Sequence, residues 1–182
     1  MIRLTRSVVS TGCVLGLGLL VLAAMAVSAT GADDGDLCPE LESLRPFIGS
    51  WVGVREEEPD LPWVYRTWTP VLAGHAIRVT RSVPMFDFEA ESIFFFDRTS
   101  GVLAYVEITN NDYVTRGSIA LDGEVFIQSG EQVQPDSTIR WVRTTFEFVG
   151  EDTVLDRFSS LEDGRWQAGH SIIYTPYQGD RQ

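Results

Sequence analysis

The chain changes character at Gly49-Ser50-Trp51-Val52-Gly53, where apolar and polar residues begin to alternate with a period of two. From there on, short runs rich in Val, Ile, Thr, Phe, Tyr and Trp are separated by turn residues, a pattern typical of antiparallel strands. We predict strands at residues 50–56, 63–69, 75–83, 89–96, 102–109, 113–121, 124–129, 138–148, 153–160 and 165–174. Tight turns such as Glu162-Asp163-Gly164 join them. The sequence therefore predicts an all-β, up-and-down barrel of about ten strands.

A short helix is predicted at residues 37–47, immediately before the first strand. Asp36 precedes it as a possible cap. Leu41, Leu44 and Phe47 fall at helical spacing, so this helix is expected to pack its apolar side onto the barrel.

The first 32 residues have the layout of a secretory signal peptide. Arg3 and Arg6 form a positive start, residues 13–27 are almost wholly apolar, and small residues follow at 28–32. This pattern predicts cleavage near Ala29 or Ala32, a secreted or periplasmic protein, and one barrel domain over residues 33–182 without stable membrane insertion. The alternative is an uncleaved anchor, because residues 8–29 are just long enough to span a bilayer.

The charge balance narrows the classes of partner. The formal net charge is -12 and every basic residue is an arginine. Nucleic acids and anionic membranes need basic patches, so neither is an expected partner. Without the predicted signal, Cys38 is the single cysteine, and the domain depends on its core rather than on internal disulfides.

The motifs of common enzymes are missing. The sequence contains no Gly-x-Ser-x-Gly, Cys-x-x-Cys, His-Glu-x-x-His or P-loop, and two histidines do not suggest an ordinary zinc site. A binding protein without a metal is therefore favoured over an enzyme. The enzyme alternative is a buried acid–base group in a barrel cavity, with Glu91, Asp156 or His170 as the base.

The motifs around the first strand resemble those of lipocalin and calycin-type barrels. The strand number is nearer to the fatty-acid-binding and nitrobindin-like members, and the wider layout resembles small bacterial lipocalin-like domains of unknown function. The resemblance covers about residues 40–177 and rests on Phe47-x-Gly49-x-Trp51-x-Gly53, Val71-Leu72-Ala73-Gly74-His75, Gly164-x-Trp166 and Tyr174-x-Pro176. It implies that Trp51, with Gly49, plugs the closed end of the barrel, beneath Arg157 or Arg165.

The same resemblance raises the alternative of a haem protein. Nitrobindin-like members bind haem through a histidine near the end of the barrel, and His170 lies on the predicted last strand. Strict alternation places it on one apolar face with Trp166 and Tyr174, pointing inward. The sequence departs from the nitrobindin pattern at Val54 and Arg55, where that family has further glycines. The other interpretation of His170 is a buried, hydrogen-bonded side chain without a cofactor, and His75 is expected to be a turn residue.

We expect a barrel that holds a small hydrophobic or amphipathic molecule. Inward polar groups on strands must be paired or meet a polar part of a ligand, while the many aromatic residues line a pocket or fill the core. A filled barrel that serves as a structural or partner-binding protein is the remaining possibility. The candidate ligand-binding residues are Tyr105, Trp141, Arg143, His170 and Tyr174.

Overall fold

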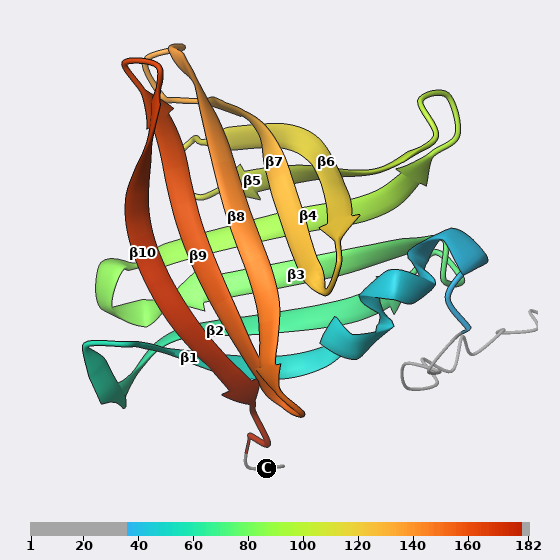
Figure 1. Cartoon of the computed structure of the whole chain (residues 1–182), viewed down its shortest axis with the longest axis horizontal. Helices are drawn as coiled ribbons and strands as arrows, with labels where there is room; N and C mark the ends of the chain where they lie inside the picture. The colour runs from blue at the N-terminus through green and yellow to red at the C-terminus, as the bar shows by residue number, and fades with distance from the viewer. Residues whose placement is uncertain (1–35, 180–182) are drawn as a thin grey trace, which may run out of the picture. The chain divides into compact units, whose positions relative to one another are not determined.

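The computed structural model describes residues 36–179, and these form a closed barrel of ten antiparallel strands (Figure 1). Each strand pairs with its neighbours in sequence, and β1 closes the barrel by pairing with both β2 and β10. The strands are β1 Gly49–Arg55, β2 Glu58–Val71, β3 Ala76–Val83, β4 Phe88–Asp97, β5 Val102–Thr109, β6 Val114–Asp122, β7 Val125–Val133, β8 Ile139–Gly150, β9 Thr153–Glu162 and β10 Arg165–Pro176. The predicted ten-stranded, up-and-down barrel is confirmed.

The largest difference from the predicted strands lies at the start of β2, which reaches back to Glu58 through a stretch expected to be a loop. The pairing of β1 with β2 shifts register on both sides of Val54, which lies opposite Pro62. Proline has no N–H to give to a ladder, and such irregularities accommodate it within a sheet. Strand β2 therefore continues across residues that usually interrupt strands.

The predicted N-terminal helix is a 3-10 helix, η1, at Pro39–Phe47. Its N-cap is Cys38 and no side chain caps it, so the expected cap by Asp36 is wrong. Instead the backbone N–H of Cys38 donates to the carbonyl of Gly74 at 3.0 Å, which ties the start of η1 to the turn between β2 and β3. The expected packing is confirmed, because Leu41, Leu44 and Phe47 are all buried.

Trp51 lies beside η1 at the closed end of the barrel, where it is 7% exposed. Its indole Nε1 donates to the carbonyl of Phe47 at 2.7 Å. Arg157 is not its partner, since this arginine is half exposed and pairs with Glu147, and Arg165 is also exposed. The nearest equivalent is Arg66, which borders the same small space as Trp51.

Close packing between strands explains the second glycine of the first-strand motif, Gly53. It faces inward, and a Cβ atom at this position would lie 2.6 Å from methyl groups of both Val64 and Ile172. Real Cβ atoms essentially never come this close to a neighbour, so any larger residue would force the side chains of the three strands to shift. Gly49, at the strand start, has φ +125°, a backbone conformation that suits glycine.

An aromatic stack extends from the closed end into the barrel. The ring of Phe47 lies on Trp68 at 5.1 Å, Trp68 on Phe94 at 5.1 Å, and Phe94 on Tyr105 at 5.6 Å. The interplanar angles of 20–28° make these stacked contacts. Helix η1, β2, β4 and β5 are thereby joined through one continuous group of rings.

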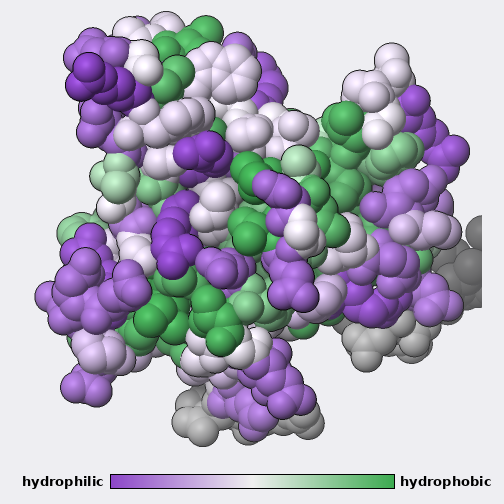
Figure 2. Space-filling view, viewed as in Figure 1, coloured by the Kyte–Doolittle hydropathy of each residue, from purple (hydrophilic) through white to green (hydrophobic). Residues whose placement is uncertain are grey.

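The predicted signal peptide lies outside the described residues. Among residues 36–179, no helix has the length and hydropathy needed to cross a membrane. Figure 2 shows hydrophilic and hydrophobic groups interspersed over the face that carries β8, β9 and β10.

Candidate functional site

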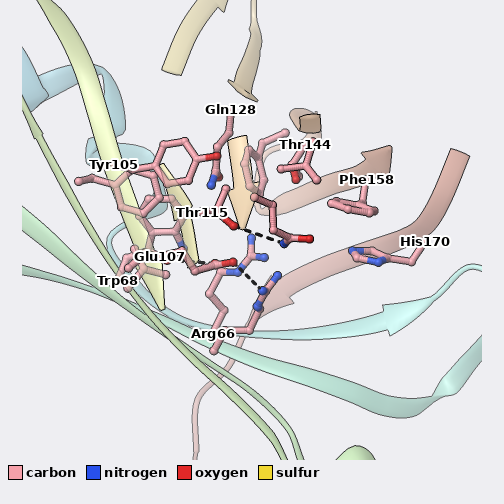
Figure 3. A pocket seen from close by; sticks show the side chains of 16 residues that line it. Arg66, Trp68, Tyr105, Glu107, Thr115, Gln128, Thr144, Phe158 and His170 are labelled. Carbon is pink, nitrogen blue, oxygen red and sulfur yellow. Dashed lines mark hydrogen bonds and ion pairs between the residues drawn. The ribbon is translucent and has the colours of Figure 1, made fainter. Parts of the chain in front are cut away.

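A polar cavity of about 150 Å³ occupies the middle of the barrel (Figure 3). The aromatic stack borders it on one side, and Phe158 and His170 lie together at the opposite side in Figure 3. Its polar lining comes from eight strands: Arg66 (β2), Arg81 (β3), Ser92 (β4), Tyr105 and Glu107 (β5), Thr115 (β6), Gln128 and Gln132 (β7), Thr144 (β8) and His170 (β10). A filled apolar core would not place so many hydrogen-bonding groups around one space.

Arg66 forms the most deeply buried ion pair of this region. Its Nη2 donates to Oδ2 of Asp156 at 3.1 Å, and the two side chains are 8% and 1% exposed. The guanidinium also lies over the rings of Phe146 and Tyr174, at 5.2 and 4.7 Å. The position of Arg66 is therefore set by one carboxylate and two rings at the base of the cavity.

Arg81 and Glu107 form a second ion pair beside the same cavity. Nη2 of Arg81 donates to Oε1 of Glu107 at 3.2 Å. The other carboxylate oxygen accepts from the Ser92 hydroxyl at 3.1 Å. The Arg81 guanidinium lies 5.1 Å from the centre of the Phe88 ring.

A second cavity of about 290 Å³ opens at the end of the barrel away from η1. Its character is different, because its lining is almost entirely aromatic and aliphatic. The lining residues are Trp63, Val64, Arg81, Val83, Phe86, Phe88, His170, Ile172 and Tyr174. Arg81 and His170 border both cavities, so they mark the junction between the apolar mouth and the polar interior.

His170 faces inward in alternation with Ile172 and Tyr174, and a bulge in β10 lies just before it. Ala168 pairs with Ser159 but Ser171 pairs with Arg157, so β10 has one residue more than β9 between these pairs. The extra residue reverses the alternation. His170 faces inward with Tyr174 as expected, whereas Trp166 lies on the outer face, 41% exposed, so the expected face shared with Trp166 is wrong.

The imidazole of His170 lies between two aromatic rings. It stacks on Phe158 at 5.1 Å and 10°, and Trp63 is 5.9 Å away on a tilted plane. No described residue forms a hydrogen bond with its ring nitrogens, so the expected hydrogen-bonded histidine is not what the structure shows. Desolvation lowers the pKa of His170 from its ordinary 6.5, and the nearby charges of Arg81, Arg66 and Arg55 act in the same direction, against Asp156. The cavities therefore border a neutral imidazole at pH 7.

The two tyrosines expected at the site are both inside the barrel. Desolvation raises the pKa of Tyr105 to about 12 in the inner cavity and that of Tyr174 to about 12 beside Arg66. Both phenols are therefore neutral hydrogen-bonding groups at physiological pH. Their contact with a ligand stays a prediction.

Trp141 and Arg143 are placed outside both cavities. The inward residues of β8 are Val142, Thr144 and Phe146, so the odd-numbered neighbours Trp141 and Arg143 face outward. Trp141 is exposed, and Arg143 lies 4.4 Å over the ring of Trp166 on the outer surface. The expectation that they line the pocket is corrected by this register.

Of the three residues weighed as a catalytic base, one borders the cavities. Glu91 is exposed on the outer face of β4, and Asp156 is paired with Arg66. His170 alone lines them, as described above. His75 is an exposed turn residue, as predicted.

Sequence reasoning missed three charged residues of the site, Arg66, Arg81 and Glu107. A signal was present for the arginines. Arg66 lies between Val64 and Trp68 at a spacing of two, and Arg81 lies between Val79 and Val83. A charged residue flanked in this way shares the inward face of its strand.

Comparison of the sequence with known protein families and with curated proteins gives no match. Among solved structures, the barrel is similar to the crystal structure of Rv2717c from M. tuberculosis, with a TM-score of 0.52 and 13% sequence identity. The similarity covers 79% of this chain and 100% of the other. At this identity the likeness concerns the fold alone, and it supports the ten-stranded closed barrel.

Proposed function

We propose that this protein binds one small amphipathic molecule inside its barrel, with the apolar part in the mouth cavity and the polar part in the inner cavity. The observation that carries the proposal is the meeting of two cavities of opposite character at Arg81 and His170. Small-molecule sites are typically concave and mostly apolar, with a few polar groups that fix orientation. The two adjoining cavities fit this description, which favours a ligand-binding barrel over a filled one.

The proposal includes export. Its support is the order of charged, apolar and small residues over the first 32 positions. N-terminal sequencing of protein recovered from the medium or the periplasm should begin near residue 30 or 33. Membrane-bound protein that retains Met1 would favour the anchor instead.

Binding is tested with the neutral fluorophore N-phenyl-1-naphthylamine, whose emission rises in apolar surroundings. We expect saturable enhancement with one site per barrel. Val83→Trp fills the mouth cavity and should abolish it, while Val102→Trp, the same change at an exposed valine, should leave it intact. Thermal melts establish that both variants fold. Absence of saturable binding to the parent, or full binding to a folded Val83→Trp, would refute the proposal.

A haem-binding barrel is the second candidate, favoured by the environment of His170. A neutral imidazole with no hydrogen-bonding partner among the described residues, at the wall of an apolar cavity, is a suitable axial ligand for haem iron. Trp63, Phe86, Phe88 and Arg81 line the same cavity as His170 and would hold the haem with it. Bound haem would supply iron chemistry, while the chain would hold and orient it.

Titration with haemin distinguishes the two candidates. A stoichiometric Soret band that His170→Ala abolishes and His75→Ala preserves would support haem binding. Binding of the neutral fluorophore without a His170-dependent Soret band would support the amphipathic ligand.

A further inference from the structure

Arg81 has hydrogen-bonding capacity that the protein does not use. Its one hydrogen bond among the described residues runs from Nη2 to Glu107, and its buried Nε has no partner. A buried donor without an acceptor is destabilising, and such groups need a partner. Since Arg81 borders both cavities, an acceptor bound inside the barrel can reach it.

The carboxylates in this region are already engaged. Glu107 accepts from Arg81 at one oxygen and from Ser92 at the other. Asp156 accepts from Arg66 at Oδ2 deeper in the barrel, while its buried Oδ1 has no partner among the described residues and does not border either cavity. Two arginines face two carboxylates, so the charges of this region balance, and the unpartnered group beside the cavities is the Nε donor of Arg81.

The walls beside Arg81 are rings. Trp63, Phe86 and Phe88 line the mouth cavity, and Phe158, stacked on His170, lines the inner cavity beyond it. Trp63 contacts both Phe86, at 6.0 Å, and His170, at 5.9 Å. Walls of this kind favour a flat aromatic body, which stacks or packs edge-on against them.

We propose that the ligand is a planar aromatic carboxylic acid whose ring system occupies the mouth cavity and whose carboxylate binds Arg81. This inference rests on the proposed function, that the barrel holds an amphipathic molecule. Arginine suits the carboxylate because its planar fork donates two parallel hydrogen bonds, which are stronger when both partners are charged. The net charge of -12 repels an anion at long range, so affinity must come from contacts at the site.

The experiment compares 2-naphthoate with its neutral analogue 2-naphthylmethanol by calorimetry at pH 7.5. The parent protein should bind the acid at least about tenfold more tightly, as expected for a charged hydrogen bond. Arg81→Gln should abolish this preference while it still binds the alcohol, which also reports that the variant is folded. Arg78→Gln is the matched control, because it removes the same charge from the exposed outer face of β3 and should keep the preference.

The possible outcomes distinguish failure of this inference from failure of the proposed function. If the parent binds the alcohol and N-phenyl-1-naphthylamine but shows no preference for the acid, the inference is refuted and the proposed function stands. A preference that survives in Arg81→Gln also refutes it. If 2-naphthoate, 2-naphthylmethanol and N-phenyl-1-naphthylamine all fail to bind, both proposals fail. Arg81→Lys keeps the charge without the planar fork and should retain only part of the preference for the acid. It is tested in place of Arg81→Gln if that variant does not fold.

Discussion

Replacing Asp156 by Asn should destabilise the barrel strongly. The change keeps the shape of the side chain but removes the charge that faces Arg66 at 3.1 Å. At this distance and an effective dielectric constant of about 20, the lost attraction is about 5 kcal/mol. In the parent, the cost of desolvating both ions offsets part of the attraction. In Asp156→Asn, Arg66 stays buried and still bears its desolvation cost, but without the opposite charge. Removing one partner of a buried pair costs about 3–5 kcal/mol of folding free energy. Because the side-chain oxygen of the introduced Asn can still accept a hydrogen bond from Arg66, we expect a loss near the lower end of this range.

The assay is urea denaturation of the parent, Asp156→Asn and a control, Glu147→Gln. The control weakens the Arg157–Glu147 pair, whose side chains are 53% and 41% exposed, and should cost less than about 1 kcal/mol. A further variant, Arg66→Met with Asp156→Leu, removes both buried charges and should be more stable than Asp156→Asn. Equal free energies of unfolding for Asp156→Asn and Glu147→Gln would refute the view that this buried pair is a main support of the interior.

Three further predictions concern the packing and titration of the interior. Trp51→Ala should lower the free energy of unfolding by about 3–5 kcal/mol, because it empties the closed end, and an unchanged thermal melt would remove Trp51 from that role. Gly53→Ala should cost about 1–3 kcal/mol by overpacking against Ile172, and a neutral effect would show that these strands can move apart. In His75→Gln, the single remaining imidazole belongs to His170, and its NMR signal should titrate below pH 6.5. Because the folded pKa is the lower one, stability should fall as the pH decreases from about 6.5, and a midpoint above 6.5 would contradict the desolvated environment.

The arrangement of strands could be predicted because it depends on local chemistry. Asp163 and Gly164 both have positive φ, the conformation of a tight hairpin turn, and Asp-Gly pairs are suited to it. The strand at residues 102–109 was predicted at its observed limits for the same reason, since turn residues bound it on both sides. Burial of Leu41, Leu44 and Phe47 likewise follows from their spacing alone.

The inward or outward direction of a side chain was less predictable. A single extra residue in β10 separates Trp166 from His170, and only the pairing with β9 reveals it. In β8, Trp141 and Arg143 face outward although a tryptophan and an arginine are common in binding sites, because their neighbour Val142 is on the core face. One residue of register reverses every side chain of a strand.

What the sequence by itself determined is the number of strands, their antiparallel order and the packing of the segment before Gly49 onto the barrel, because alternation, turn residues and apolar spacing act over a few residues. The tertiary structure alone decided which charges meet. Arg66 and Asp156 are 90 positions apart, and Arg81 and Glu107 are 26 apart. Closure of the barrel brings each pair within hydrogen-bonding distance, and the same closure joins an apolar mouth to a polar interior at Arg81 and His170. Such contacts depend on the register of all ten strands together, which no local pattern contains.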